Sequence, residues 1–256
     1  MSERGNPYVT INKKNLNTRL ELFVINHSDG AVFQIQGASE FFSKKLQLKG
    51  TIIPNPISID EHIDYIPIDK REKSIVSVGR LDNYQKRYDI MFKAFAIFSQ
   101  RHSEYVLKIY GTGADEEKIR QFAIDEKIKD KVLFKGVTNN PIRDISTDGI
   151  FLITSDYEGI SNSLLEAMAA GLPCVSTDSS PGGARMLIDN KINGLLCPIR
   201  NPDAIADALN LFVENRHLAE KCGKEARNVI SRFDKNVIIG KWENYINNIK
   251  QKYNEK

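Results

Sequence analysis

The 256-residue sequence predicts an α/β protein with a doubly wound parallel sheet, and three observations support this fold class. From Ser74 onward, short apolar runs alternate with longer helical patterns. Each run is continuously apolar, which is typical of parallel strands that are buried on both faces. After Pro202 the pattern becomes wholly helical. Together these observations indicate a sheet of about six strands with helices on both sides.

The expected strands follow one another at short intervals. They cover residues 74–81 (SIVSVGRL), 105–111 (YVLKIYG), 131–137 (KVLFKGV), 149–155 (GIFLITS), 173–178 (PCVSTD) and 194–199 (GLLCPI). Helical patterns occupy residues 87–102, 115–128, 163–171, 184–190, 203–216, 217–233 and 235–252. We therefore assign residues 74–235 to one sheet-based domain and residues 236–256 to a C-terminal amphipathic helix.

The first 73 residues contain fewer elements. Two strand candidates, residues 20–26 (LELFVIN) and 31–36 (AVFQIQ), accompany one helix candidate, residues 39–47 (SEFFSKKLQ). Because these elements cannot close a core of their own, we interpret residues 1–56 as a partial N-terminal domain. Residues 57–73 are the expected linker, which the chain enters through an extended, proline-containing segment (TIIPNPI).

Composition and charge argue against several classes of protein. A net charge of +3, with basic residues scattered along the chain, does not favour nucleic-acid binding. No window approaches the run of roughly 20 apolar residues that a membrane span needs, and the N-terminus lacks the pattern of a secretory signal. The three cysteines have neither metal-binding nor paired spacing, so a reducing, cytoplasmic location is expected.

A polar segment, residues 159–163 (GISNS), lies between a predicted strand and a predicted helix. Ligands of open parallel sheets bind at the carboxyl ends of strands, where first-turn N–H groups of a helix can hold a phosphate. Glu158 precedes this segment and Glu166 follows it. Each glutamate also has a simpler interpretation. Ser163 and Glu166 match a capping box, and Glu158 is equally explained as a solvated loop carboxylate.

Cations follow a neighbouring strand. Gly79 and Arg80 end the first strand of the larger domain, and Gln85, Lys86 and Arg87 come a few residues later. Arg binds phosphate through a planar fork and Lys binds it as a point charge, so together they can neutralise a diphosphate. Ordinary surface charge at a helix start is the alternative. With carboxylates nearby to accept hydrogen bonds from hydroxyls, the pattern predicts a nucleotide diphosphate carrying a hydroxyl-rich group.

Six segments resemble one known family. They are residues 77–95 (SVGRLDNYQKRYDIMFKAF), 110–122 (YGTGADEEKIRQF), 134–140 (FKGVTNN), 157–178 (YEGISNSLLEAMAAGLPCVSTD), 181–199 (PGGARMLIDNKINGLLCPI) and 202–209 (PDAIADAL). In this order they look like the C-terminal, donor-binding half of retaining glycosyltransferases with the GT-B fold, family 4 (glycosyl transferases group 1). Glu158 and Glu166, eight positions apart, match the family's signature.

The resemblance implies a Rossmann-like donor domain, transfer with retention from a UDP- or GDP-sugar, and no bound metal or other cofactor. Arg80 and Lys86 would hold the donor diphosphate and, with Glu158, form the catalytic set. Glu158 would face the donor sugar and Glu166 the ribose, while the residues after the third strand would lie near the base. The implied donor-binding residues are Gly79, Arg80, Lys86, Val137, Thr138, Glu158, Gly159, Ile160, Ser161, Asn162, Ser163 and Glu166.

Two departures from the family pattern affect these expectations. Arg87 stands where glycine is more common, and its role is open. Residues 1–56 resemble only the last strands and helix of the acceptor-binding domain, which in the family supplies a histidine to the cleft between the domains. None of the four histidines matches that position, and His27, within the N-terminal segment, is interpreted as a loop residue.

The resemblance implies a polysaccharide or lipid-linked glycan as acceptor. One alternative is a truncated or inactive nucleotide-sugar-binding module that needs another chain for the acceptor half. A sugar-nucleotide epimerase has a similar two-domain architecture, but the spacing of Glu158 and Glu166 argues against it.

Two surfaces are expected to lack cover. The partial N-terminal domain exposes apolar faces, so we expect self-association or a partner chain; a clean monomer in gel filtration at high concentration would contradict this. Trp242, Tyr245 and Ile249 form the apolar face of the last helix. This helix packs either on its own domain or, as in the family, back on the N-terminal domain. Its lysines also leave weak contact with the inner face of a membrane as an open expectation.

Overall fold

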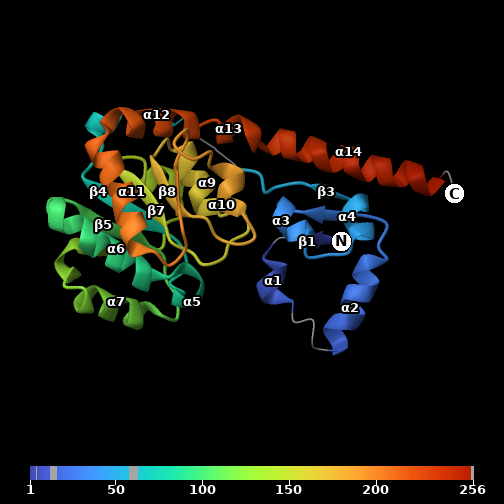
Figure 1. Cartoon of the computed structure of the whole chain (residues 1–256). Helices are drawn as coiled ribbons and strands as arrows, with labels where there is room; N and C mark the ends of the chain where they lie inside the picture. Colours follow the sequence, from blue (N-terminus) through green and yellow to red (C-terminus); the bar gives the residue numbers. More distant parts are fainter. Residues whose placement is uncertain (4, 12–15, 58–62, 255–256) are drawn as a thin grey trace.

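A six-stranded parallel sheet forms the centre of the larger unit of the molecule (Figure 1). This computed structural model describes all residues except 4, 12–15, 58–62 and 255–256. The strands are β4 (Ser74–Val78), β5 (Val106–Tyr110), β6 (Val132–Gly136), β7 (Ile150–Ile153), β8 (Cys174–Thr177) and β9 (Leu195–Cys197). Their order is β6-β5-β4-β7-β8-β9, and every neighbouring pair is parallel. The expected strands and the doubly wound fold class are therefore confirmed.

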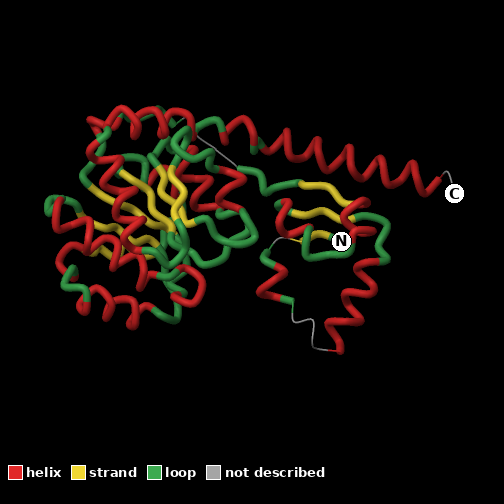
Figure 2. The backbone as a smooth tube through the Cα atoms, in the orientation of Figure 1, coloured by secondary structure: helices red, strands yellow, loops and turns green. Residues whose placement is uncertain are grey.

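Helices cover both faces of this sheet, as the alternation of apolar segments requires (Figure 2). Neighbouring strand residues point to opposite cores, Ile75 to one and Val76 to the other. The first core contains apolar residues of α6 (Tyr88–Arg101), α7 (Glu116–Asp125), α11 (Pro202–Glu214) and α12 (Arg216–Ala226). The second contains those of α8 (Pro141–Asp144), α9 (Asn162–Ala169), α10 (Gly183–Leu187) and α13 (Val229–Arg232). A short 3-10 turn, η2 (Lys129–Lys131), leads into β6.

The N-terminal unit is a smaller α/β layer with its own core. Its parallel strands, in the order β1-β2-β3, are β1 (Ser2–Glu3), β2 (Ala31–Phe33) and β3 (Gly50–Ile52). The helices around them are α1 (Pro7–Thr10), α2 (Leu16–Asn26), α3 (Gln36–Ser39) and α4 (Lys44–Lys49). Phe33, Phe42 and Leu46 are buried together at its centre.

Three expectations for this unit were wrong, and the first was that its elements cannot close a core of their own. Residues 20–26, expected as a strand, belong to α2. Leu22 and Ile25 pack on the core, as residues three apart on a helix do, whereas Leu20 and Phe23 are exposed on another side. Apolar residues on both sides resemble the pattern of a buried strand. The single helix expected at residues 39–47 is divided between α3 and α4, because the hydroxyl of Ser43 accepts from a first-turn amide and starts α4 anew.

Residues 57–73, the expected linker, include residues 58–62, which lie outside the described part of the chain. The rest of the segment carries η1 (Ile68–Lys70) and packs on the larger unit. Arg71 is 8% exposed and donates hydrogen bonds to backbone oxygens of Ser146, Asp148 and Gly171. These contacts attach the end of the linker to the segments that lead into β7 and β8.

The last helix, α14 (Lys235–Asn254), runs from the larger unit across the N-terminal unit (Figure 1). Ile238 is buried beside Val32 of β2. The hydroxyl of Tyr245 accepts from the amide of Ala31 at 2.8 Å and donates to the carbonyl oxygen of Lys49 at 2.5 Å. The helix therefore takes the second of the two packings considered, on the N-terminal unit.

An exposed apolar stripe runs along α2. Leu20, Phe23 and Val24 are 59%, 63% and 69% exposed, and positions i, i+3 and i+4 share one helix face. Self-association through the N-terminal unit stays a prediction that this stripe supports. Across the described residues, no helix combines the length and the apolar character that crossing a membrane requires.

Candidate functional site

The candidate site lies where the order of the strands reverses. β4 and β7 are neighbours in the sheet, and the helices α6 and α9 that follow them pack on opposite faces. Ligands of open α/β sheets bind at such a switch point, beyond the carboxyl ends of the strands. Residues 79–87 follow β4 and residues 154–163 follow β7. The structure thus brings the two predicted clusters to the same edge of the sheet.

A short helix, α5 (Asn83–Lys86), carries Lys86 to this edge. Asp82 caps the helix, because its carboxylate accepts hydrogen bonds from two first-turn amides. The hydroxyl of Thr154, just after β7, donates to the carbonyl oxygen of Lys86 at 2.9 Å. The side chain of Gln85 donates to the backbone of the same segment at 3.1 Å. These bonds hold the two clusters in fixed relation to each other.

Lys86 and Glu158 form an ion pair between the two clusters. Nζ of Lys86 lies 2.5 Å from Oε1 of Glu158, and the hydroxyl of Ser155 donates to the same oxygen at 2.9 Å. Both charged side chains are 13% exposed, so water and salt screen the pair less than a surface pair. The arrangement offers a positive charge for a phosphate and a carboxylate that can accept hydrogen bonds from hydroxyls.

Arg80 lies at the exposed rim of the same site. Its guanidinium donates to Oε1 of Gln85 at 3.0 Å. Because a guanidinium has five N–H donors, this bond leaves most of them available to an anion. Gly79 leaves room for the neighbouring lysine, since a Cβ at this position would lie 3.3 Å from Cε of Lys86. The structure therefore brings Arg80, Lys86 and Glu158 together.

Arg87, whose role was open, is neutralised within the fold. Its guanidinium donates to Asp89 at 2.8 and 2.9 Å and to Asp156 at 2.8 Å, and Arg200 also pairs with Asp156. These hydrogen bonds, that with Asp89 foremost, hold the pKa of Arg87 above its ordinary value. Its φ of 55° lies in the left-handed region, which gives a physical reason for the glycine that is more common there in the family.

The helix α9 begins earlier than the capping-box interpretation requires. Ser161 is the N-cap, and its hydroxyl accepts from the amide of Leu164 at 3.4 Å. Glu166 therefore lies in the second turn, and the capping-box interpretation was wrong. The amides of Asn162 and Ser163 belong to the first turn, where an α-helix supplies no backbone acceptor. They form an electropositive helix start at this edge of the sheet.

Glu166 lies in a partly buried position on α9. Burial raises the pKa of its carboxyl to about 7. Desolvation alone causes this shift, and no residue that the structure describes forms a salt bridge with Glu166. Such perturbed groups beside a crevice are candidates for ligand contact.

Val137 and Thr138 follow β6, at the same edge of the sheet but two strands away from β4. Val137 is 69% exposed, and the hydroxyl of Thr138 donates to Asp144 at 2.5 Å. An exposed apolar side chain beside a hydroxyl can contact the face of a nucleotide base. Their contact with a base stays a prediction.

Two residues that the sequence did not single out reach this site from the N-terminal unit. Oε1 of Gln34 accepts a hydrogen bond from the amide of Ile160 at 3.0 Å. Nδ2 of Asn6 donates to the carbonyl oxygen of Ser180 at 3.1 Å. The amide of Ile160, expected to meet the donor, is thus engaged by Gln34. A local sequence pattern cannot predict these pairs, because their members are 126 and 174 positions apart.

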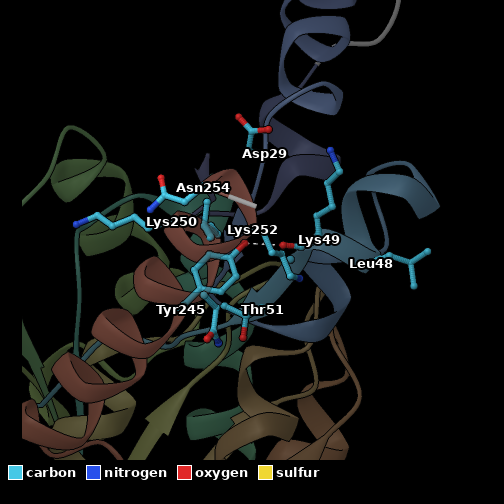
Figure 3. Close-up of a pocket in the computed structure, with 11 residues that line it drawn as sticks. Asp29, Leu48, Lys49, Thr51, Tyr245, Lys250, Lys252 and Asn254 are labelled. Carbon is cyan, nitrogen blue, oxygen red and sulfur yellow. Dashed lines mark hydrogen bonds between the residues drawn. The ribbon is translucent and has the colours of Figure 1, made fainter. Parts of the chain in front are cut away.

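A pocket of about 940 Å³ opens elsewhere, between the N-terminal unit and the end of α14 (Figure 3). Lys49, Lys250 and Lys252 line it together with Asp29 and the exposed Leu48. Within the described chain, it shares no lining residue with the edge of the larger sheet described above.

Comparison with known proteins identifies the class. The family model of glycosyl transferases group 1 matches residues 58–229, so the chain belongs to that family.

Related sequences agree with this family. An uncharacterized glycosyltransferase of Haemophilus influenzae is 31% identical over 193 residues, covering 74% of this chain and 54% of the relative. The poly(ribitol-phosphate) alpha-N-acetylglucosaminyltransferase of Staphylococcus aureus is 31% identical over 163 residues, covering 63% and 33%. The lipopolysaccharide 1,6-galactosyltransferase of Salmonella typhimurium is 34% identical over 167 residues, covering 61% and 43%. The chain spans about half of the length of these relatives, or less.

Solved structures share the fold over most of this chain. A mutant of S. aureus TarM, in complex with Fondaparinux, alpha-GlcNAc-glycerol and UDP, matches with a TM-score of 0.81 and 24% identity. The match covers 96% of this chain and 50% of TarM. The lipopolysaccharide outer core galactosyltransferase WaaB, in its apo form, matches with a TM-score of 0.75 and 25% identity, covering 91% and 64%. These neighbours confirm the GT-B type of fold with its Rossmann-like unit.

Proposed function

We propose that the chain is the donor-binding part of a retaining, family 4 glycosyltransferase that moves a sugar from a nucleotide diphosphate-sugar to a glycan or glycolipid acceptor. The observation that carries the proposal is the meeting of Lys86, Glu158 and the start of α9 at the switch point of the sheet. Family membership supports it. So do relatives named for transfer to poly(ribitol-phosphate) and lipopolysaccharide, and the UDP in the TarM structure.

The proposed mechanism depends on charge. Arg80 and Lys86 hold the diphosphate, and the first-turn amides of α9 meet it from the other side. As the bond between the sugar and the diphosphate breaks, negative charge develops on the leaving phosphate oxygen. Preorganised cations and helix N–H groups stabilise such charge at little cost of reorganisation. Glu158 accepts hydrogen bonds from sugar hydroxyls, and Glu166 accepts them from the ribose.

A transfer assay tests this function. The purified chain is incubated with UDP- and GDP-sugars and with glycan or lipid-linked acceptors, and the product is followed by NMR. We expect a product whose anomeric configuration equals that of the donor. Inversion would refute retention, and saturable donor binding without any product would favour the alternative of a binding module that needs another chain.

Donor affinity should depend on pH through Glu166, whose pKa is raised to about 7 by burial. Ribose hydroxyls donate to the ionised carboxylate, so binding below pH 7 requires the loss of a proton. Affinity for a nucleotide sugar should fall roughly tenfold for each pH unit below 7 and level off above pH 8. Calorimetric titrations from pH 5.5 to 8.5 measure this dependence.

Two variants make the test specific. Glu166→Gln should bind more weakly and without this pH dependence, because the amide does not titrate. Glu117→Gln, on the exposed side of α7, is the matched control and should behave as the unmodified chain does. An unchanged pH profile in Glu166→Gln would remove Glu166 from the site.

A further inference from the structure

Two buried polar side chains of the N-terminal unit reach into the larger unit. Gln34, directly after β2, is 2% exposed, and Asn6, the N-cap of α1, is 4% exposed. Gln34 accepts from the amide of Ile160, and Asn6 donates to the carbonyl oxygen of Ser180. A buried polar side chain without a partner is unfavourable, so these contacts bind the two units at defined atoms.

Gln34 contacts the segment that carries Glu158, and Asn6 contacts the neighbouring segment to which Glu158 is hydrogen-bonded. The amide of Glu158 donates to the carbonyl oxygen of Ser180 at 2.9 Å, and Tyr157 and Ser180 form a parallel bridge. Ser180 thus accepts hydrogen bonds from both Glu158 and Asn6. A little further along, a Cβ at Gly183 would lie 1.6 Å from the carbonyl oxygen of Gly159. The two segments therefore touch backbone to backbone.

The backbones of the two units also touch directly beside Ser180. A Cβ at Gly37, three residues after Gln34, would lie 1.9 Å from the carbonyl oxygen of Pro181. Only a residue without a side chain allows so close an approach. The N-terminal unit therefore meets the larger unit at the segments that carry Glu158, through Asn6, Gln34 and Gly37.

We propose that Gln34 and Asn6 are positioning residues for the donor sugar, so that the N-terminal unit sets the orientation of Glu158. The inference rests on the proposed function. Without Gln34, the amide of Ile160 loses its acceptor, and the backbone from Glu158 to Ile160 is held less firmly, by the bond of the Glu158 amide to Ser180. Lys86 and Arg80, which would contact the diphosphate, keep their bonds to Thr154 and Gln85, and Ser161 still caps α9, because the loss of one hydrogen bond does not push the backbone aside.

The test compares two ligands, because positioning of Glu158 affects the sugar and not the diphosphate. In Gln34→Met, affinity for the nucleotide sugar should fall about tenfold, the loss of one hydrogen-bonded contact, while affinity for the nucleoside diphosphate stays within about threefold. Gln34→Glu keeps an acceptor for the Ile160 amide and should restore sugar binding. Gln36→Met, two residues away and exposed, is the matched control.

A second variant protects the test against misfolding. Asn6→Asp keeps the oxygen that caps α1 but removes the donor to Ser180, and it should show the same selective loss. If Gln34→Met and Asn6→Asp both bind the nucleotide sugar and the nucleoside diphosphate as tightly as the unmodified chain, the positioning role is refuted. The proposed function would still stand. Absence of nucleotide-sugar binding by the unmodified chain would instead refute the proposed function.

Discussion

Replacement of Lys86 by alanine is expected to lower the rate of sugar transfer by about 100- to 1,000-fold, the usual effect of removing one preorganised charge from a transition state. Lys86 is held by the capped α5 turn and by Thr154, and its ammonium lies 2.5 Å from Glu158. Its loss removes the positive charge that meets the leaving diphosphate, while the Glu158 carboxylate keeps the hydrogen bond from the hydroxyl of Ser155. Steady-state kinetics with a saturating acceptor measure the effect.

Two controls separate chemistry from folding. Lys93→Ala, on the exposed side of α6, removes the same charge away from the site and should keep the full rate. Glu158→Gln keeps the cation, so it should bind nucleoside diphosphate at least as tightly as the unmodified chain while transfer falls. A Lys86→Ala enzyme that retains more than a tenth of the unmodified rate would contradict the role of this lysine.

Gly183→Ala is expected to unfold the site. The added Cβ would lie 1.6 Å from the carbonyl oxygen of Gly159, and backbone atoms on both sides leave no flexible group to yield. Overpacking typically costs about 1–3 kcal/mol of unfolding free energy, and a clash with backbone is expected at the upper end of this range. The displaced Gly159 segment also carries Glu158 and the start of α9, so donor binding should be lost. Urea unfolding and donor titration measure the two effects.

Gly240→Ala is the matched control for this substitution. Gly240 lies within α14, and a Cβ there would meet nothing within 4 Å. Alanine inside a helix stabilises it by about 0.5 to 1 kcal/mol relative to glycine, so the expected change has the opposite sign. If the Gly183→Ala chain keeps the stability and the donor affinity of the unmodified chain, the close backbone packing of Gly183 on Gly159 does not support the site.

The fold of the larger unit was predictable because its rules are local and repeated. A strand buried on both faces must be apolar throughout, and each helix between strands needs one apolar side. The N-terminal unit follows these rules less well. The helix α2 carries apolar residues both on its packed side, with Leu22 and Ile25, and on its exposed side, with Phe23, so its pattern resembled a strand.

The site was predictable where its residues follow one another in the chain. The clusters around Lys86 and Glu158 come directly after strands, and parallel topology alone brings them to one edge. Gln34 was not predictable, since its bond to Ile160 depends on how two units pack. The sequence also could not show that Arg87 forms ion pairs with Asp89 and Asp156, while Lys86 pairs with Glu158. The sequence shows which residues are charged, but only the folded structure shows which opposite charge each of them pairs with.

The most direct measurement of the central claim is a calorimetric titration of UDP, GDP and their sugar conjugates into the purified chain, repeated with Lys86→Ala and Glu166→Ala. We predict saturable binding to one nucleotide series, with at least a tenfold loss of affinity in each variant. No binding at millimolar ligand, by a chain shown to be folded, would contradict a donor site in this unit. So would binding that both variants leave unchanged.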